Sequence, residues 1–169
     1  MLAKFIKGKV YIFIDGENLF YAQQSLGWRI SYEKLIKYFQ QECGSTVKCF
    51  IYKGIDENNV KQKVFLDMLD INGYILRTKV VKVIKDEAGK NFWKGNLDIE
   101  LALEAVEFKD KFDTAILISG DSDFAVLLEK LKKAGKRVIV MSTRGRVAKE
   151  LLNIAKFVDL RKLRDQISQ

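Results

Sequence analysis

The sequence contains no histidine and no proline among its 169 residues. Without histidine, Ser-His-Asp and Cys-His catalytic arrangements are impossible, and no imidazole can ligate zinc or shuttle protons. Cysteine is scarce as well. Cys43 and Cys49 form neither a disulfide framework nor a CxxC pair, so we interpret both as buried structural thiols. Acid–base or metal chemistry must therefore use carboxylates, lysine, tyrosine, these thiols or metal-bound water.

Long apolar runs are also missing. No stretch approaches the roughly 18–20 apolar residues that a membrane-spanning helix needs. The basic N-terminus is not followed by an apolar stretch of signal-peptide length, because the run Val10–Ile14 stops at Asp15. Neither GxGxxG after the first expected strand nor GxxxxGK[ST] occurs, which disfavours a nucleotide-binding Rossmann site. We expect a cytoplasmic protein without a membrane partner.

Positive charge is abundant. Lysine and arginine total 30 against 22 aspartates and glutamates, which gives a formal net charge of +8. Residues 130–149 include eight basic side chains and no acidic one. Arg144 and Arg146 stand in a loop-like Ser-Thr-Arg-Gly-Arg segment, where a solvated helix face does not explain them. This distribution favours a polyanionic partner such as nucleic acid, with both arginines as candidate substrate contacts.

The hydrophobic pattern alternates between two periods. Apolar runs rich in β-branched and aromatic residues predict buried strands at residues 10–14, 46–52, 74–82, 114–119 and 137–141. Amphipathic stretches predict helices at residues 31–42, 58–69, 97–108, 124–134 and 147–155. Residues 84–92 resemble an exposed hairpin. This alternation predicts one α/β domain over residues 1–169 around a mostly parallel sheet, with a core of about 9–160 and a C-terminal helix at 160–169.

Carboxylates follow two of the expected strands directly. Asp15 ends the first strand, and Asp121 and Asp123 follow the strand at 114–119 just before a helix. Ligands of open α/β sheets bind beyond the carboxyl ends of the strands, so these side chains occupy positions typical of a site. Helix capping is the simpler alternative for Asp121 or Asp123. Two aspartates, a glycine and two serines in Ser-Gly-Asp-Ser-Asp are more than a cap requires.

Asp98 is placed by a helical-wheel argument. In the helix expected at 97–108 it shares a face with Leu101 and other apolar side chains, where a carboxylate must be paired, hydrogen-bonded, metal-bound or a cap. The opposite face carries Glu100, Glu104 and Glu107, which we interpret as a solvated stripe.

Four aspartates meeting at one sheet edge would repel one another unless a divalent cation neutralises them. Oxygen donors without nitrogen or sulfur select Mg²⁺ or Mn²⁺, which leave positions open for phosphate oxygens and water. We therefore expect Asp15, Asp98, Asp121 and Asp123 to be metal ligands and catalytic residues in phosphodiester hydrolysis. A basic rim would then hold the nucleic-acid backbone around this acidic pocket.

Three segments together resemble the NYN domain, the LabA-like branch of the PIN-like nuclease superfamily. They are Ile14-Asp15-Gly16-Glu17-Asn18-Leu19-Phe20, Lys94-Gly95-Asn96-Leu97-Asp98 and Ile118-Ser119-Gly120-Asp121-Ser122-Asp123-Phe124, and the resemblance extends from Val10 to about Leu160. It implies a PIN-like, Rossmann-like three-layer α/β/α sandwich and metal-dependent RNA cleavage. It also implies that Asn18 orients substrate or water, and that Ser119, Ser122 and Lys94 contact substrate.

The leading hypothesis is thus a Mg²⁺- or Mn²⁺-dependent ribonuclease acting on single-stranded or structured RNA, with Trp93 of the hairpin as the aromatic side chain expected to contact RNA. A non-catalytic RNA-binding or regulatory module would show binding that survives chelation and yields no product. A small-molecule phosphatase would turn over phosphomonoesters and ignore RNA. The oligomeric state stays open, a homodimer included.

Overall fold

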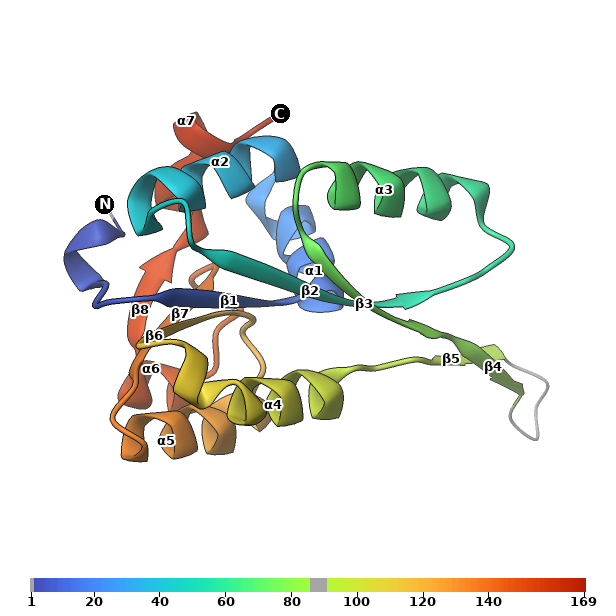
Figure 1. Ribbon diagram of the computed structural model, residues 1–169. Coiled ribbons are helices and arrows are strands. Elements are labelled where there is room, and N and C mark those ends of the chain that lie inside the picture. Colours follow the sequence, from blue (N-terminus) through green and yellow to red (C-terminus); the bar gives the residue numbers. More distant parts are fainter. Residues whose placement is uncertain (1, 86–90) are drawn as a thin grey trace.

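The computed structural model describes residues 2–85 and 91–169, with side chains except those of 83–85 and 91–94 (Figure 1). Its centre is a six-stranded sheet in which every pairing is parallel. In spatial order its strands are β3 (Ile75–Val80), β2 (Lys48–Ile55), β1 (Val10–Asp15), β6 (Thr114–Ile118), β7 (Arg137–Ser142) and β8 (Lys156–Asp159). A second, antiparallel pair consists of β4 (Lys82–Lys85) and β5 (Asn91–Lys94).

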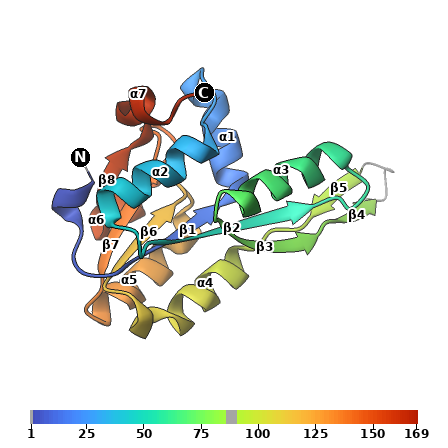
Figure 2. The ribbon, with the colours of Figure 1, turned by 45° about the horizontal axis from the view of Figure 1, so that its top comes forward.

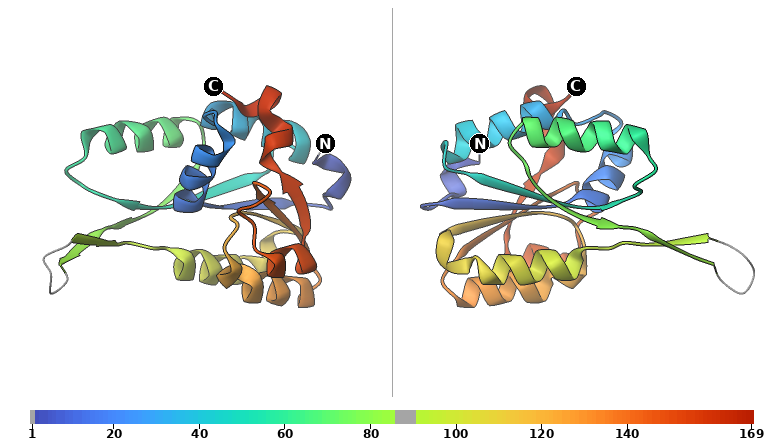
Figure 3. Two further views of the ribbon diagram at one scale, coloured as in Figure 1. Left: turned by 180° about the vertical axis from the view of Figure 1, so that it is seen from behind. Right: turned by 45° about the vertical axis from the view of Figure 1, so that its right-hand side comes forward.

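Helices cover both faces of the sheet (Figures 1 and 3). One layer contains α1 (Gly16–Leu26), α2 (Tyr32–Cys43), α3 (Val60–Ile71) and α7 (Arg164–Ile167). The other contains α4 (Asp98–Glu107), α5 (Ala125–Lys133) and α6 (Lys149–Ile154). Short 3₁₀ turns are η1 (Ala3–Phe5), η2 (Lys109–Lys111), η3 (Ser122–Phe124) and η4 (Leu160–Leu163). Turning the molecule, as in Figure 2, shows α1, α2 and α3 lying across the same face of the sheet.

The two faces of β1 explain the continuous apolar run that predicted it. Successive strand residues point to opposite faces, and a parallel sheet covered on both sides buries all of them. Ile12 and Ile14 join the core beneath α1 and α2, whereas Tyr11 and Phe13 join the core against α4 and α5. The predicted three-layer α/β fold around a parallel sheet is therefore confirmed.

Two elements lie outside the prediction. Helix α1 follows β1 without a break, because Asp15 caps it: its carboxylate accepts a hydrogen bond from the Asn18 N–H. The four-residue strand β8 was not predicted, and the expected C-terminal helix is divided between η4 and α7. The hairpin is present as β4 and β5, while residues 86–90 of its predicted turn lie outside the described residues.

Within the described ranges, no helix has the length and apolarity to cross a membrane.

Candidate active site

A cavity of about 390 Å³ lies where the carboxyl ends of the central strands meet α1 and α4. It is lined by three of the four predicted aspartates, Asp15, Asp98 and Asp121, together with Asn18. These residues come from β1, α4, the loop after β6 and α1, so the fold brings together segments about a hundred positions apart. These three carboxylates therefore line one cavity at the carboxyl end of the sheet.

Asp15 is the most buried of them, with 8% of its surface exposed. Its carboxylate accepts hydrogen bonds from the Asn18 N–H at 3.0 Å and from the Ser119 hydroxyl at 3.0 Å. The pKa of Asp15 is nevertheless raised to about 6, mainly because burial penalises the charged form, with a smaller contribution from the nearby charges of Asp98 and Asp121. Among the residues that the structure describes, no lysine or arginine forms an ion pair with Asp15.

Ser119 and Asn18 connect Asp15 to the loop after β6. The Ser119 hydroxyl oxygen accepts a hydrogen bond from the Asp121 N–H at 3.2 Å, and Asn18 Oδ1 accepts one from the Gly120 N–H at 3.0 Å. Ser119 is 1% exposed, so these contacts occupy a hydroxyl that the sequence had suggested for substrate. Both side chains fix the position of Asp121 relative to Asp15.

Gly120 is packed too closely for any side chain. A Cβ at this position would collide with the carbonyl oxygen of Arg146, and the Gly120 carbonyl accepts a hydrogen bond from the Ala148 N–H at 2.9 Å. The segment 143–148 therefore closes directly over the loop that carries Asp121. A substrate contact was predicted for the Arg146 side chain, whereas the structure shows the Arg146 backbone packed against Gly120.

Asp98 is the first residue of α4, and its carboxylate does not cap that helix. It accepts a hydrogen bond from Asn96 Nδ2 at 2.6 Å, while the Asp98 N–H donates to Asn96 Oδ1 at 2.7 Å. Partial burial raises its pKa, an effect that the Asn96 hydrogen bond opposes and the charges of Asp121 and Asp123 reinforce. Among the described residues, no lysine or arginine forms an ion pair with any of these three carboxylates.

Asp121 acts as a cap, because its carboxylate accepts the Asp123 N–H at 3.0 Å at the start of η3, so the capping alternative is confirmed for it. Asp123 and Ser122 are exposed and do not belong to the described lining of the cavity. Within the described residues, no three acidic or thiol side chains are close enough to hold one metal ion. The oxygen donors suit a hard cation, and they stand around the cavity rather than forming a closed ligand set.

The remaining predicted substrate residues lie elsewhere. Arg144 and Arg146 are exposed on the loop after β7 and are not among the described residues that line this cavity. The backbone of Trp93 and Lys94 belongs to β5, and their side chains lie outside the described set.

The stripe interpretation is wrong for Glu104, because its side chain is only 16% exposed. The Glu104 carboxylate accepts hydrogen bonds from the Arg77 guanidinium and from the Tyr52 hydroxyl, both at 2.6 Å. Tyr52 itself lines the cavity. The helical wheel could not find this cluster, because the partners come from β2 and β3. The buried Tyr52 near the carboxyl end of a predicted strand was the available signal.

Two aromatic side chains near the site are unexpectedly open. Phe20 and Tyr21 of α1 are 50% and 51% exposed, their rings are 5.6 Å apart, and Tyr21 lines the cavity. Neither ring is a core residue, and Tyr21 leaves aromatic surface open at the cavity that Asp15 also lines.

The model of the NYN domain matches residues 9–161 of this chain. The chain belongs to the NYN domain family. The NYN domain is a PIN-like nuclease family. The low amplitude and bright protein LabA of Synechococcus elongatus is 35% identical over 169 residues, which cover 98% of this chain and 90% of LabA.

A solved structure agrees with the fold. The crystal structure of a protein of unknown function from Vibrio parahaemolyticus superposes with a TM-score of 0.78 at 26% identity. The match covers 96% of this chain and 97% of that one, so the sheet and both helical layers are shared.

Proposed function

We propose that this NYN domain protein is a divalent-metal-dependent ribonuclease whose site is the cavity of Asp15, Asp98 and Asp121. The observation that carries the proposal is Asp15, a carboxylate with 8% exposure, a pKa raised to about 6 and no cationic partner among the described residues. Such a group is costly in a folded protein unless a cation joins it. Two further carboxylates at the same cavity give a ligand set of oxygens, which suits Mg²⁺ or Mn²⁺.

Asp15, Asp98 and Asp121 would hold the ion, with exposed Asp123 nearby. Bound there, it would activate water and neutralise charge on the scissile phosphate. The chain's own residues supply the positioning. Asn18 and Ser119 hold the Gly120–Asp121 backbone against Asp15, so the carboxylates keep their relative positions without a metal. We assign Ser119 to this positioning role rather than to substrate contact.

The polyanionic substrate follows from charge and exposed rings. The protein carries a net charge of +8. Tyr21 at the cavity and its neighbour Phe20 are both half-exposed aromatic rings on which unpaired bases can stack. A duplex would keep its bases from these rings. The arrangement therefore favours single-stranded RNA or an unpaired region of a structured RNA.

A non-catalytic RNA-binding module is the second candidate. The separation of the carboxylates favours this candidate, because no three of the described acidic side chains are close enough to bind the same metal ion. This alternative predicts RNA binding with no product, whatever metal is added.

The test is cleavage of an end-labelled single-stranded RNA by the wild type in EDTA, Mg²⁺ or Mn²⁺. We expect product only with metal, and a loss of about a hundredfold or more, near 2.7 kcal/mol, in Asp121→Asn. Asp110→Asn is the matched control, because Asp110 lies on η2, away from the cavity, with a side chain 80% exposed. Equal activity of wild type and Asp121→Asn, or turnover of p-nitrophenyl phosphate without RNA cleavage, would overturn the proposal.

A further inference from the structure

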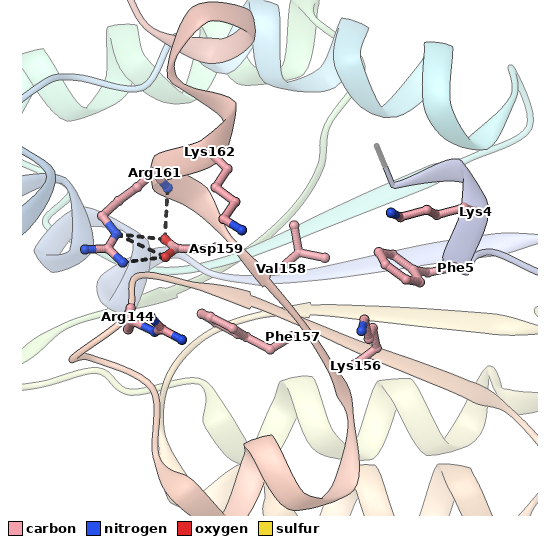
Figure 4. A pocket seen from close by; sticks show the side chains of 9 residues that line it. All are labelled: Lys4, Phe5, Arg144, Lys156, Phe157, Val158, Asp159, Arg161 and Lys162. Atoms are coloured by element: carbon pink, nitrogen blue, oxygen red, sulfur yellow. Dashed lines mark hydrogen bonds and ion pairs between the residues drawn. The ribbon is translucent and has the colours of Figure 1, made fainter.

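A second hollow, of about 300 Å³, lies along β8, the last strand of the sheet (Figure 4). We call it the β8 groove. Its lining includes Phe5 and Phe157 and five cationic side chains: Lys4, Arg144, Lys156, Arg161 and Lys162. In Figure 4 these side chains extend from Lys4 and Lys156 at one end to Arg144 and Arg161 at the other. All five cations are exposed.

The groove has almost no negative charge of its own. Asp159 is the acidic residue in its described lining, and its carboxylate accepts hydrogen bonds from Arg161 Nη2 at 2.6 Å and Nε at 3.0 Å. Within the described residues, Lys4, Arg144, Lys156 and Lys162 form no ion pairs. Four cations therefore remain for an external anion.

Aromatic rings support the cations. The ammonium groups of Lys4 and Lys156 lie 5.0 and 4.7 Å from the centroid of the same ring, Phe5. Half-buried Phe157 adds an apolar face beside Arg144 in Figure 4. A positive groove with interspersed aromatic rings is the usual surface for a single nucleic-acid strand.

The position of the groove links it to the acidic cavity. Strands β1, β6, β7 and β8 are parallel, so their carboxyl ends lie along one edge of the sheet. Neighbouring strands are about 4.8 Å apart, which places the end of β8 about 10 Å from the end of β6 and about 14 Å from Asp15 on β1.

The loop after β7 bridges that interval. The Arg144 backbone helps to lower the pKa of Asp159 in the groove, and the Ala148 N–H of the same loop donates to the Gly120 carbonyl beside Asp121. One loop therefore contacts both a residue of the groove and the backbone next to the cavity.

We propose that the β8 groove binds the backbone of single-stranded RNA and leads it to the acidic cavity. The choice of RNA as the polyanion rests on the proposed function. A second copy of the chain is a poorer occupant. Pairing two β8 edges would bring both sets of lysines together, and edge lysines are a known barrier to such pairing.

The test measures binding of a labelled oligouridine long enough to span both hollows, by fluorescence anisotropy in EDTA over a range of salt concentrations. The double variant Lys156→Gln/Lys162→Gln should weaken binding about tenfold and lower the slope of log K against log salt by about 1.4. The control Lys61→Gln/Lys63→Gln removes the same charge from exposed positions of α3 and should alter neither. Lys156→Arg/Lys162→Arg should retain binding, and thermal melting checks the folding of each variant.

If the two glutamine double variants weaken RNA binding equally, or if neither weakens it, the proposed RNA-binding role of the groove is overturned. Stronger binding of duplex RNA or of phosphatidylserine vesicles would also overturn it, because the proposed occupant is a single strand. The outcome is separable from the proposed function, since binding in EDTA needs no catalysis. If binding depends on the groove but Mn²⁺ gives no cleavage, the RNA-binding role of the groove is supported and the ribonuclease proposal is contradicted. If the protein cleaves RNA but the groove variant binds RNA as wild type does, the ribonuclease proposal is supported and the role of the groove is contradicted.

Discussion

Asp15 and Asp159 end two parallel strands of the same sheet and are equally buried, at 8% exposure. Their pKa values nevertheless move in opposite directions. Burial raises the pKa of Asp15 to about 6, and its two hydrogen bonds do not compensate. Burial acts on Asp159 as well, but the hydrogen bonds and charge of Arg161 outweigh it and lower the pKa. A buried carboxylate with a guanidinium partner is a structural pair, whereas one without a cation is a candidate for binding one.

The two hollows around these aspartates differ in construction. In the acidic cavity, short side chains are fixed to the backbone by Asn18 and Ser119. In the β8 groove, the cations stand on long exposed side chains that can follow a flexible polyanion. Fixed geometry suits chemistry at one phosphate, and mobile charge suits binding along a strand. Substitutions in the cavity should therefore alter catalysis, and substitutions in the groove should alter RNA binding.

The largest expected effect is pH-dependent. The Asp15 carboxyl has a pKa near 6 when folded and 3.8 as its ordinary value. In metal-free protein its contribution to stability is therefore full below pH 4 and lost as the pH rises through 6, by about 3 kcal/mol. Thermal unfolding in EDTA should show this loss in wild type and in Asp110→Asn, and a smaller one in Asp15→Asn. Mn²⁺ should then raise the melting temperature more at pH 8 than at pH 5; a response independent of pH contradicts the role of Asp15.

Next in size is Asp98→Asn. Removing one ligand charge should lower kcat for RNA about a hundredfold, near 2.7 kcal/mol, while the Kd for RNA in EDTA stays the same or improves. Single-turnover kinetics and anisotropy measure the two quantities on the same RNA. The groove variant described above should show the opposite pattern. If Asp98→Asn weakens binding as much as it slows cleavage, the division of labour between cavity and groove is wrong.

Gly120→Ala tests the contact between the two regions. The new Cβ would meet the Arg146 carbonyl oxygen, which is backbone and cannot swing aside, so we expect a loss of about 2 kcal/mol in the free energy of unfolding. Ser122→Ala alters the same loop at an exposed position and serves as the control. Urea unfolding compares the two. A similar urea midpoint for both variants would show that the 143–148 loop is not packed closely against Gly120.

The smallest effect is expected from Tyr21→Ala. Loss of one exposed stacking surface should raise the KM for single-stranded RNA about tenfold with little change in kcat. Tyr21→Phe keeps the ring and should behave as wild type. Steady-state kinetics of both variants decide the question, and equal defects in the two would assign the effect to the hydroxyl instead.

Much of this arrangement could be predicted from the sequence. The apolar runs identified five of the six strands of the main sheet, and the rule that ligands bind at strand carboxyl ends placed Asp15 and Asp121 at one edge. The wheel argument brought Asp98 to the same cavity. These predictions succeeded because each depends on local periodicity and on the general behaviour of parallel sheets.

Other features depend on contacts that no local pattern encodes. Glu104 was assigned to a solvated stripe, yet Arg77 and Tyr52 reach it from neighbouring strands. The β8 groove combines Lys4 with Lys156, which are 152 positions apart, around a strand of four residues that was not predicted. The roles of Ser119 and Asn18 as backbone anchors likewise appear only once β1 and β6 are adjacent.

The central claim is that the acidic cavity holds a divalent cation, and anomalous scattering from crystals grown with Mn²⁺ tests it most directly. The account predicts an ion in contact with the Asp15 carboxylate, next to Asp98 and Asp121, and no ion there in Asp15→Asn crystals. An empty cavity at saturating Mn²⁺ in a preparation that still cleaves RNA, or an ion bound only elsewhere, would contradict it.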